Sequence, residues 1–118
     1  MGTKKANTSA NSTEGKRPQR LVLKLGTNLL TGGRNSLDLE TIENICRQVA
    51  AVKAAGVEIL IVTSGAVAAG RESLLRTPGK TTLQNGTVAY RQTLAALGQP
   101  QLMMTFKQVF ADHDIEVA

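Results

Sequence analysis

Two short segments of this sequence place small polar residues where they could hold an anion. In one of them, Thr63-Ser64-Gly65 follows the apolar run of residues 57–62 and precedes an alanine-rich stretch that begins at Ala66. A strand, a small polar turn and a helix in this order present free backbone N–H groups at the helix start, where the helix dipole also favours a phosphate or a carboxylate. Because Gly65 lacks a Cβ atom, we expect it to let the anion approach the backbone. An ordinary connection between strand and helix, with no ligand, is the alternative.

The other segment, Leu23-Lys24-Leu25-Gly26-Thr27, carries one cation near the end of a short apolar run. A lysine at the end of a buried strand is costly unless an anionic group pairs with it, so Lys24 is a candidate anion ligand. The alternative is a lysine whose ammonium group extends into water from an edge strand.

A βαβ unit is expected to position both segments. Residues 21–25 and 57–62 are predicted to be strands, and the second is predicted to be buried on both faces because it is apolar and β-branched at almost every position. Apolar residues at spacings of three and four predict a helix over 39–52, with Asp38 as its N-cap and Gly56 after its last turn.

The right-handed crossover of such a unit brings the loops after both strands to one edge of the sheet. This carboxyl edge is where open α/β sheets bind ligands, so the two turns should face one another across one pocket. This proximity favours a shared anion site over two unrelated turns. The residues expected there are Lys24, Gly26, Thr27, Ser64, Gly65 and Ala66.

The rest of the chain is predicted to add helices and part of a further strand. Helices are expected at 66–75, 88–97 and 102–110, with the last two separated at Gly98-Gln99-Pro100 because proline suits a helix start. Residues 115–118 are interpreted as the opening of a third strand.

The composition limits the chain to one domain with an aliphatic core, since 118 residues include 42% apolar and only 3% aromatic side chains. The net charge of +5 is concentrated in residues 1–20, where five Lys and Arg stand against one Glu, whereas residues 21–118 carry nine against eight. We therefore predict a disordered basic tail over residues 1–20. We expect no nucleic-acid-binding surface, because the folded part lacks a clustered basic face with interleaved aromatic residues.

The single cysteine, Cys46, excludes an internal disulfide and is expected to be a small buried hydrophobe. No apolar run is long enough for a membrane span, and no signal peptide is recognisable, so we expect no membrane association. The cytoplasm is therefore the expected compartment.

Several motifs, in matching order over about residues 20–118, resemble the amino acid kinase family. The Lys-x-Gly opening alone would indicate only the wider family, whereas the Ser-Gly-Ala-x-Ala-Ala-Gly-Arg run, together with the Gln and Gly-Gln of the segment 91–99, is typical of its glutamate-phosphorylating branch. Asn28 departs from the pattern, because the family usually has Ser there. The motifs are Leu23-Lys24-Leu25-Gly26-Thr27, Leu29-Leu30-Thr31-Gly32-Gly33, the segment 61–72 and the segment 91–99.

The resemblance implies a three-layer α/β/α sandwich with a mostly parallel sheet, of which residues 21–118 would be a truncated, N-terminal part. It also implies ATP-dependent phosphorylation of the γ-carboxylate of L-glutamate to glutamyl 5-phosphate, the first step of proline biosynthesis. ATP and Mg²⁺ would be the cofactors, with no metal ligand supplied by this chain, and the full-length enzyme would be a homo-oligomer.

Residue by residue, the resemblance makes Lys24 and Gly65 the catalytic residues. Lys24, Gly26 and Thr27 would bind the nucleotide, and Ser64, Gly65 and Ala66 would bind glutamate and line the phosphoryl path. The remaining glutamate ligands and the second lysine of the family lie downstream of residue 118, so we expect little or no activity from this chain alone. Two alternatives stay open: a non-catalytic interaction module that pairs through its open sheet edge, and an amino acid kinase acting on another carboxylate or a carbamate.

Overall fold

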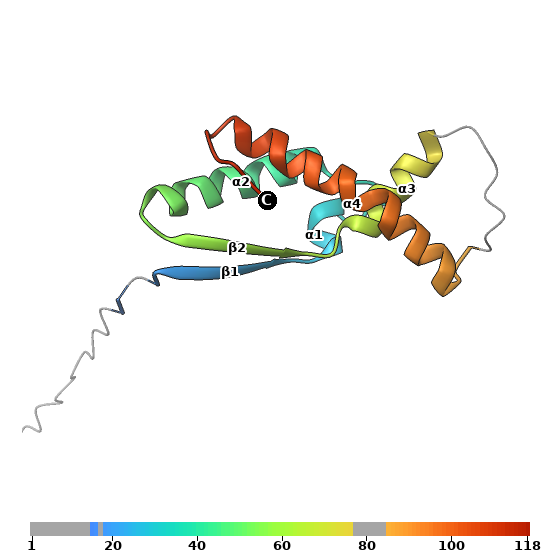
Figure 1. Cartoon of the computed structure of the whole chain (residues 1–118), viewed down its shortest axis with the longest axis horizontal. Helices are drawn as coiled ribbons and strands as arrows, with labels where there is room; N and C mark the ends of the chain where they lie inside the picture. Colours follow the sequence, from blue (N-terminus) through green and yellow to red (C-terminus); the bar gives the residue numbers. More distant parts are fainter. Residues whose placement is uncertain (1–14, 17, 77–84) are drawn as a thin grey trace, which may run out of the picture.

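The computed structural model describes residues 15–16, 18–76 and 85–118, so most of the predicted basic tail lies outside the described residues. Two strands and four helices follow one another in an α/β arrangement, which confirms the predicted class (Figure 1). The elements are β1 (Arg20–Leu25), α1 (Thr27–Thr31), α2 (Leu39–Ala54), β2 (Glu58–Thr63), α3 (Ala66–Arg76) and α4 (Val88–Ala111).

The strands β1 and β2 are parallel and pair in register from Arg20 opposite Glu58 to Leu25 opposite Thr63. The connection through α2 is the predicted crossover, and Gly56 lies after the helix with φ of +87°. This left-handed conformation favours glycine, which explains why the helix ends there.

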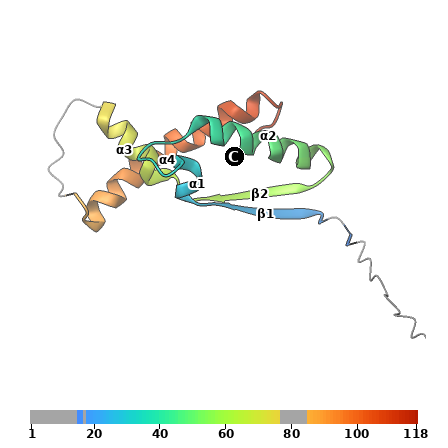
Figure 2. The same cartoon turned by 180° about the vertical axis from the view of Figure 1, so that it is seen from behind.

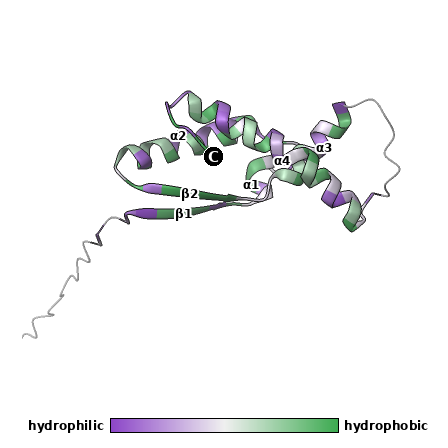
Figure 3. Ribbon diagram, viewed as in Figure 1, coloured by the Kyte–Doolittle hydropathy of each residue, from purple (hydrophilic) through white to green (hydrophobic). Residues whose placement is uncertain are grey.

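Within the described residues the sheet is covered on one face only, so the prediction that its second strand is buried on both faces is wrong. Figures 1 and 2 show α2 and the C-terminal half of α4 on the same side of β1 and β2. Leu23, Ile59 and Ile61 pack toward these helices. On the other face Val22 and Leu60 are 60% and 57% exposed, although the strands are apolar along most of their length (Figure 3). An apolar strand is buried on both faces only where a second layer exists, and the described residues supply one layer of helices.

The core lies between the sheet, α2 and α4 and is aliphatic apart from a stacked pair, Phe106 and Phe110, whose ring centroids are 6.3 Å apart. Cys46 is fully buried, as predicted, and burial raises the pKa of its thiol to about 11. No helix in the described ranges is long and apolar enough to cross a membrane.

Helix α4 runs without interruption through Pro100, so the predicted break between two helices is wrong. Proline removes one helical hydrogen bond and costs about 3 kcal/mol inside a helix. On either side of it Leu94 and Leu102 are fully buried, and each contributes about 2–3 kcal/mol of hydrophobic stabilisation. Burial on both sides of the proline therefore outweighs its local cost.

The predicted third strand is also wrong, because the sheet within the described residues has two strands and residues 115–118 form no ladder. Ile115 and Val117 pack against the core, and Glu116 pairs with Lys107 at 2.7 Å. Asp114 has φ of +56°, and the N–H of Ile115 returns to the carbonyl of Phe110. After this tight reversal the last residues pack against the core and line one groove with residues 59–61 of β2, without pairing with that strand.

Candidate functional site

The two predicted turns lie in contact at the carboxyl edge of the sheet. The N–H of Ser64 donates to the carbonyl of Leu25 at 3.3 Å, which continues the strand pairing by one residue. The hydroxyl of Thr27 lies 3.1 Å from the carbonyl oxygen of Ser64 and 3.0 Å from its Oγ. The predicted proximity of the two turns is therefore confirmed, and hydrogen bonds hold them together, whereas the pocket expected between them stays a prediction.

Lys24 lies on the uncovered face of the sheet, opposite Val62, with its side chain exposed. No carboxylate among the described residues forms an ion pair with it. A Cβ atom added to Gly26 would lie 3.8 Å from the Nζ of Lys24, so the ammonium group lies close beside the turn. The site thus has an unneutralised cation that an anion could reach.

Gly65 is buried, and its missing Cβ faces the core instead of the open edge. A Cβ atom there would lie 3.0 Å from Cδ1 of Leu30 and 3.2 Å from Cδ1 of Leu102. The expectation that this glycine leaves room for a ligand is therefore wrong, because the space that it saves is taken by leucine side chains. Ala66 is the first residue of α3, and the N–H of Ala69 donates to the carbonyl of Gly65 at 3.1 Å.

The sequence did not reveal which side chains pack against the second turn at Gly65. Leu30 and Leu102 come from α1 and α4 and are fully buried under Gly65. It also missed Thr63, whose Oγ1 is buried without a hydrogen-bond partner among the described residues. A threonine directly after the apolar residues 59–62 was the available signal, since a buried hydroxyl normally has a partner.

The segment after Ser64 continues into a close crossing of α3 and α4. A Cβ atom on Gly70 would lie 1.8 Å from the carbonyl oxygen of Leu94, and one on Gly98 would lie 1.7 Å from that of Ala66. Helices α3 and α4 therefore cross with their backbones in contact. This crossing fixes the start of α3, and with it the turn that bears Ser64.

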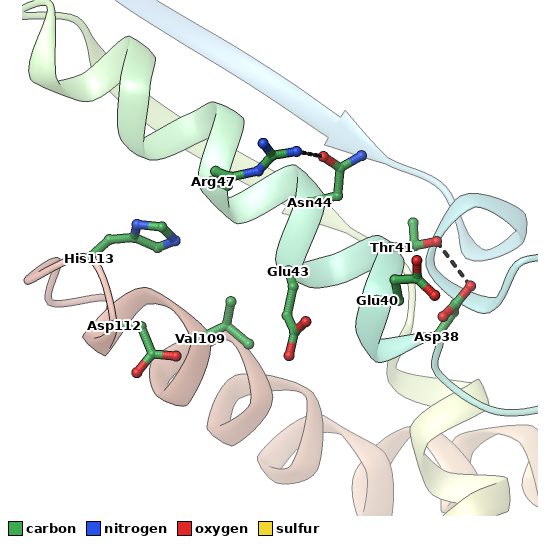
Figure 4. Close-up of a pocket in the computed structure, with 9 residues that line it drawn as sticks. All are labelled: Asp38, Glu40, Thr41, Glu43, Asn44, Arg47, Val109, Asp112 and His113. Carbon is green, nitrogen blue, oxygen red and sulfur yellow. Dashed lines mark hydrogen bonds between the residues drawn. The ribbon is translucent and has the colours of Figure 1, made fainter.

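A second concave region lies apart from the turns, between α2 and the end of α4 (Figure 4). It has a volume of about 850 Å³ and is lined by Asp38, Glu40, Thr41, Glu43, Asn44, Arg47, Val109, Asp112 and His113. The hydroxyl of Thr41 donates to Asp38 and holds the pKa of that carboxyl below its ordinary value, with Arg34 nearby adding to the effect. Within the described ranges no group of three His, Cys, Asp or Glu is placed to hold a metal ion. None of the six predicted site residues lines this groove.

Comparison with known proteins agrees with the family resemblance of the sequence motifs over most of the chain. A family model described as the amino acid kinase family matches residues 19–118. A glutamate 5-kinase of Dehalococcoides mccartyi strain 195 is 46% identical over 101 residues, which cover 85% of this chain and 26% of that relative. One of Escherichia coli O1:K1 is 48% identical over 99 residues, covering 84% of this chain and 26% of that relative.

The match to a glutamate 5-kinase of Vibrio vulnificus strain YJ016 is longer, at 110 residues and 41% identity, and covers 93% of this chain. The chain spans about a quarter of the length of these curated relatives. The matched residues include both turns and all six described helices and strands. The chain therefore belongs to the amino acid kinase family.

Proposed function

We propose that this chain is the N-terminal part of a glutamate 5-kinase, which phosphorylates the γ-carboxylate of L-glutamate with ATP in the first step of proline biosynthesis. The observation that carries the proposal is the contact between Thr27 and Ser64, which joins two turns of different strands beside the free ammonium group of Lys24. The similarity to glutamate 5-kinases over 84–93% of the chain supports the choice of substrate.

The chemistry is a transfer between two anions. A γ-carboxylate oxygen of glutamate attacks the terminal phosphorus of ATP, an O–P bond forms, and the bond to the bridging oxygen breaks to release ADP. Such a transfer needs alignment and charge neutralisation more than a covalent nucleophile. Lys24 would neutralise phosphate charge, and the amides of Gly65 and Ala66 at the start of α3 would act as fixed dipoles.

The residues at the two turns fit ATP with Mg²⁺ better than they fit a metal held by protein alone. On the nucleotide side, Lys24 offers a cation, and Gly26 and Thr27 offer backbone groups, of which Gly26 is free of a Cβ atom. Ser64, Gly65 and Ala66 offer the glutamate side. Because the six residues include no carboxylate, Mg²⁺ would bind through the phosphates of ATP, which is its usual mode in kinases.

The proposal covers only one side of the cleft. The chain has a quarter of the length of its relatives, so we expect little glutamate-dependent ATP turnover from the 118 residues alone. The complete enzyme would supply the rest of the site, would form a homo-oligomer and would act in the cytoplasm.

The test is a fusion of the full 118-residue chain to the part of the Escherichia coli relative that follows the matched segment. Acyl phosphate is trapped with hydroxylamine and ADP release is followed in parallel. We expect glutamate-dependent turnover that falls about a hundredfold in Lys24→Ala, the size of effect seen when one charge-stabilising group is removed. Lys53→Ala, an exposed lysine in the last turn of α2, is the matched control and should leave turnover unchanged. A folded fusion without glutamate-dependent turnover would refute the proposal.

The fusion and the 118-residue chain also test two other functions. An amino acid kinase for another substrate would show turnover with aspartate or N-acetylglutamate in place of glutamate. A non-catalytic interaction module is favoured by one observation, the exposed apolar side chains of Val22, Leu60 and Val62 on the open sheet face. Light scattering of the 118-residue chain distinguishes it, because a stable monomer speaks against an interaction surface.

A further inference from the structure

We infer that Thr27 is a positioning residue for Ser64, and that the pair makes the Ser64 hydroxyl an acceptor for the ammonium group of an amino acid substrate. The inference rests on the proposed function and adds to it which end of the substrate Ser64 holds. It starts from the hydrogen-bonding groups of Ser64, nearly all of which are already occupied.

The backbone of Ser64 has no free N–H donor to offer to a ligand. Its N–H donates to the carbonyl of Leu25 at 3.3 Å. Its carbonyl oxygen accepts from the hydroxyl of Thr27 at 3.1 Å. Whether Ser64 can donate a hydrogen bond to a ligand is therefore decided by its side chain, which is exposed at the open edge.

The two hydroxyls have two protons to share between two contacts. A carbonyl oxygen cannot donate, so the 3.1 Å contact requires the proton of Thr27. The 3.0 Å contact between the hydroxyl oxygens is then filled by the proton of Ser64, which donates to Thr27 Oγ1. In this assignment each contact has a proton of its own. Ser64 Oγ has then used its proton and can only accept a further hydrogen bond.

An oxygen that offers only lone pairs complements an N–H donor and opposes a carboxylate. The α-ammonium group of an amino acid has three N–H donors, whereas its carboxylates only accept. We therefore place the ammonium group of the substrate at Ser64 and the reacting carboxylate toward the cation of Lys24. Thr27 contributes without touching the substrate, since its hydroxyl is taken up by Ser64.

The first test measures the pair itself in the 118-residue chain by thermal unfolding. Thr27→Val and Ser64→Ala should each lower Tm by about 4 °C, and the double variant should fall no further than the worse single variant. Thr27→Ser keeps the hydroxyl and should restore most of the loss. Thr93→Val removes an exposed helical hydroxyl that donates to the carbonyl of Ala89, and this control should combine additively with Ser64→Ala. Additive losses for Thr27→Val and Ser64→Ala would overturn the inference.

The second test measures substrate recognition in the active fusion. Thr27→Val should raise KM for glutamate about tenfold while kcat and KM for ATP change less than about twofold, as expected for loss of ground-state binding. Thr27→Ser should bring KM back to within about threefold of the unsubstituted fusion. Ser64→Ala should raise KM for glutamate but leave KM unchanged for glutarate, which has the same carboxylates and no ammonium group.

The outcomes separate this inference from the proposed function. A fusion without turnover in the presence of a coupled pair refutes the proposed function and the ammonium assignment, and leaves only the positioning of Ser64 by Thr27 supported. Turnover in which Thr27→Val raises KM for ATP alone, or in which Ser64→Ala impairs glutarate as much as glutamate, overturns the inference and leaves the proposed function standing. The last result would mean that Thr27 shares one proton between both oxygens of Ser64 and that Ser64 donates to a carboxylate.

Discussion

The helix crossing and the sheet edge use small residues from one continuous segment for opposite purposes. At the crossing, Gly70 and Gly98 bring two backbones into contact with no space for a methyl group. At the edge, Thr27 and Ser64 join two turns through hydroxyls that remain open to solvent on one side. The mostly small residues 64–70 are therefore not one feature, because the start of the segment carries polar chemistry and its end carries packing.

The largest effect should come from the crossing. Gly98→Ala places a Cβ atom 1.7 Å from the carbonyl oxygen of Ala66, and neither backbone can move without separating α3 from α4. We expect a loss of more than about 3 kcal/mol in the free energy of unfolding, or no native fold at all. Urea unfolding followed by circular dichroism measures it. Gly15→Ala, whose Cβ would meet nothing within 4 Å, is the control. A variant as stable as the parent would show that the crossing is not close-packed.

The second effect should come from the support beneath the edge. Leu102→Ala removes a fully buried side chain that touches the position of Gly65, so we expect a loss of about 3 kcal/mol. Leu97→Ala, on the same helix but 42% exposed, should cost clearly less. Equal losses for the two leucines, measured by urea unfolding, would contradict the burial that separates them.

A smaller effect of opposite sign is expected at Thr63, the last residue of β2, directly before the turn that bears Ser64. Thr63→Val keeps the shape of the side chain and removes a buried hydroxyl that has no partner among the described residues. We expect a gain of about 1 kcal/mol in the free energy of unfolding, because the desolvated polar group is lost without losing a hydrogen bond. Thr105→Val serves as the comparison, since that hydroxyl bonds to the carbonyl of Gln101. A destabilised Thr63→Val chain would mean that the hydroxyl is satisfied in solution.

The smallest effect on stability should come from the cation at the edge. Lys24 is exposed and pairs with no carboxylate of the described residues, so Lys24→Ala should change the free energy of unfolding by less than about 0.5 kcal/mol. Unfolding curves of the two chains should therefore superimpose. A large loss would place Lys24 among the packing residues and remove the contrast between edge and crossing.

Much of the edge could be predicted from sequence, because its signals are local. Apolar runs, the alternation of strand and helix, and small polar residues directly after each run indicate a βαβ unit whose two turns meet. The left-handed Gly56 could be predicted for the same reason, since one residue type favours that backbone conformation. The roles of Lys24, Ser64 and their neighbours in catalysis and binding remain predictions.

The errors share one origin, which is that they depended on what packs against the segment. Pro100 predicts a helix break, but the burial of Leu94 and Leu102 keeps α4 intact. Residues 115–118 have the composition of a strand, but the reversal at Asp114 folds them against the core. Gly65 was assigned to ligand access, whereas Leu30 and Leu102 occupy the space beside it.

The sequence by itself determined the α/β class, the two parallel strands and the identity of the residues at their carboxyl ends. These follow from the period of apolar side chains and from residue types with strong backbone preferences, which act over a few neighbours. Only the tertiary structure decided which sheet face is covered, why Gly65, Gly70 and Gly98 must lack a side chain, and that the hydroxyls of Thr27 and Ser64 lie within hydrogen-bonding distance. Those outcomes depend on atoms brought together from distant parts of the chain, and no local pattern encodes their distances.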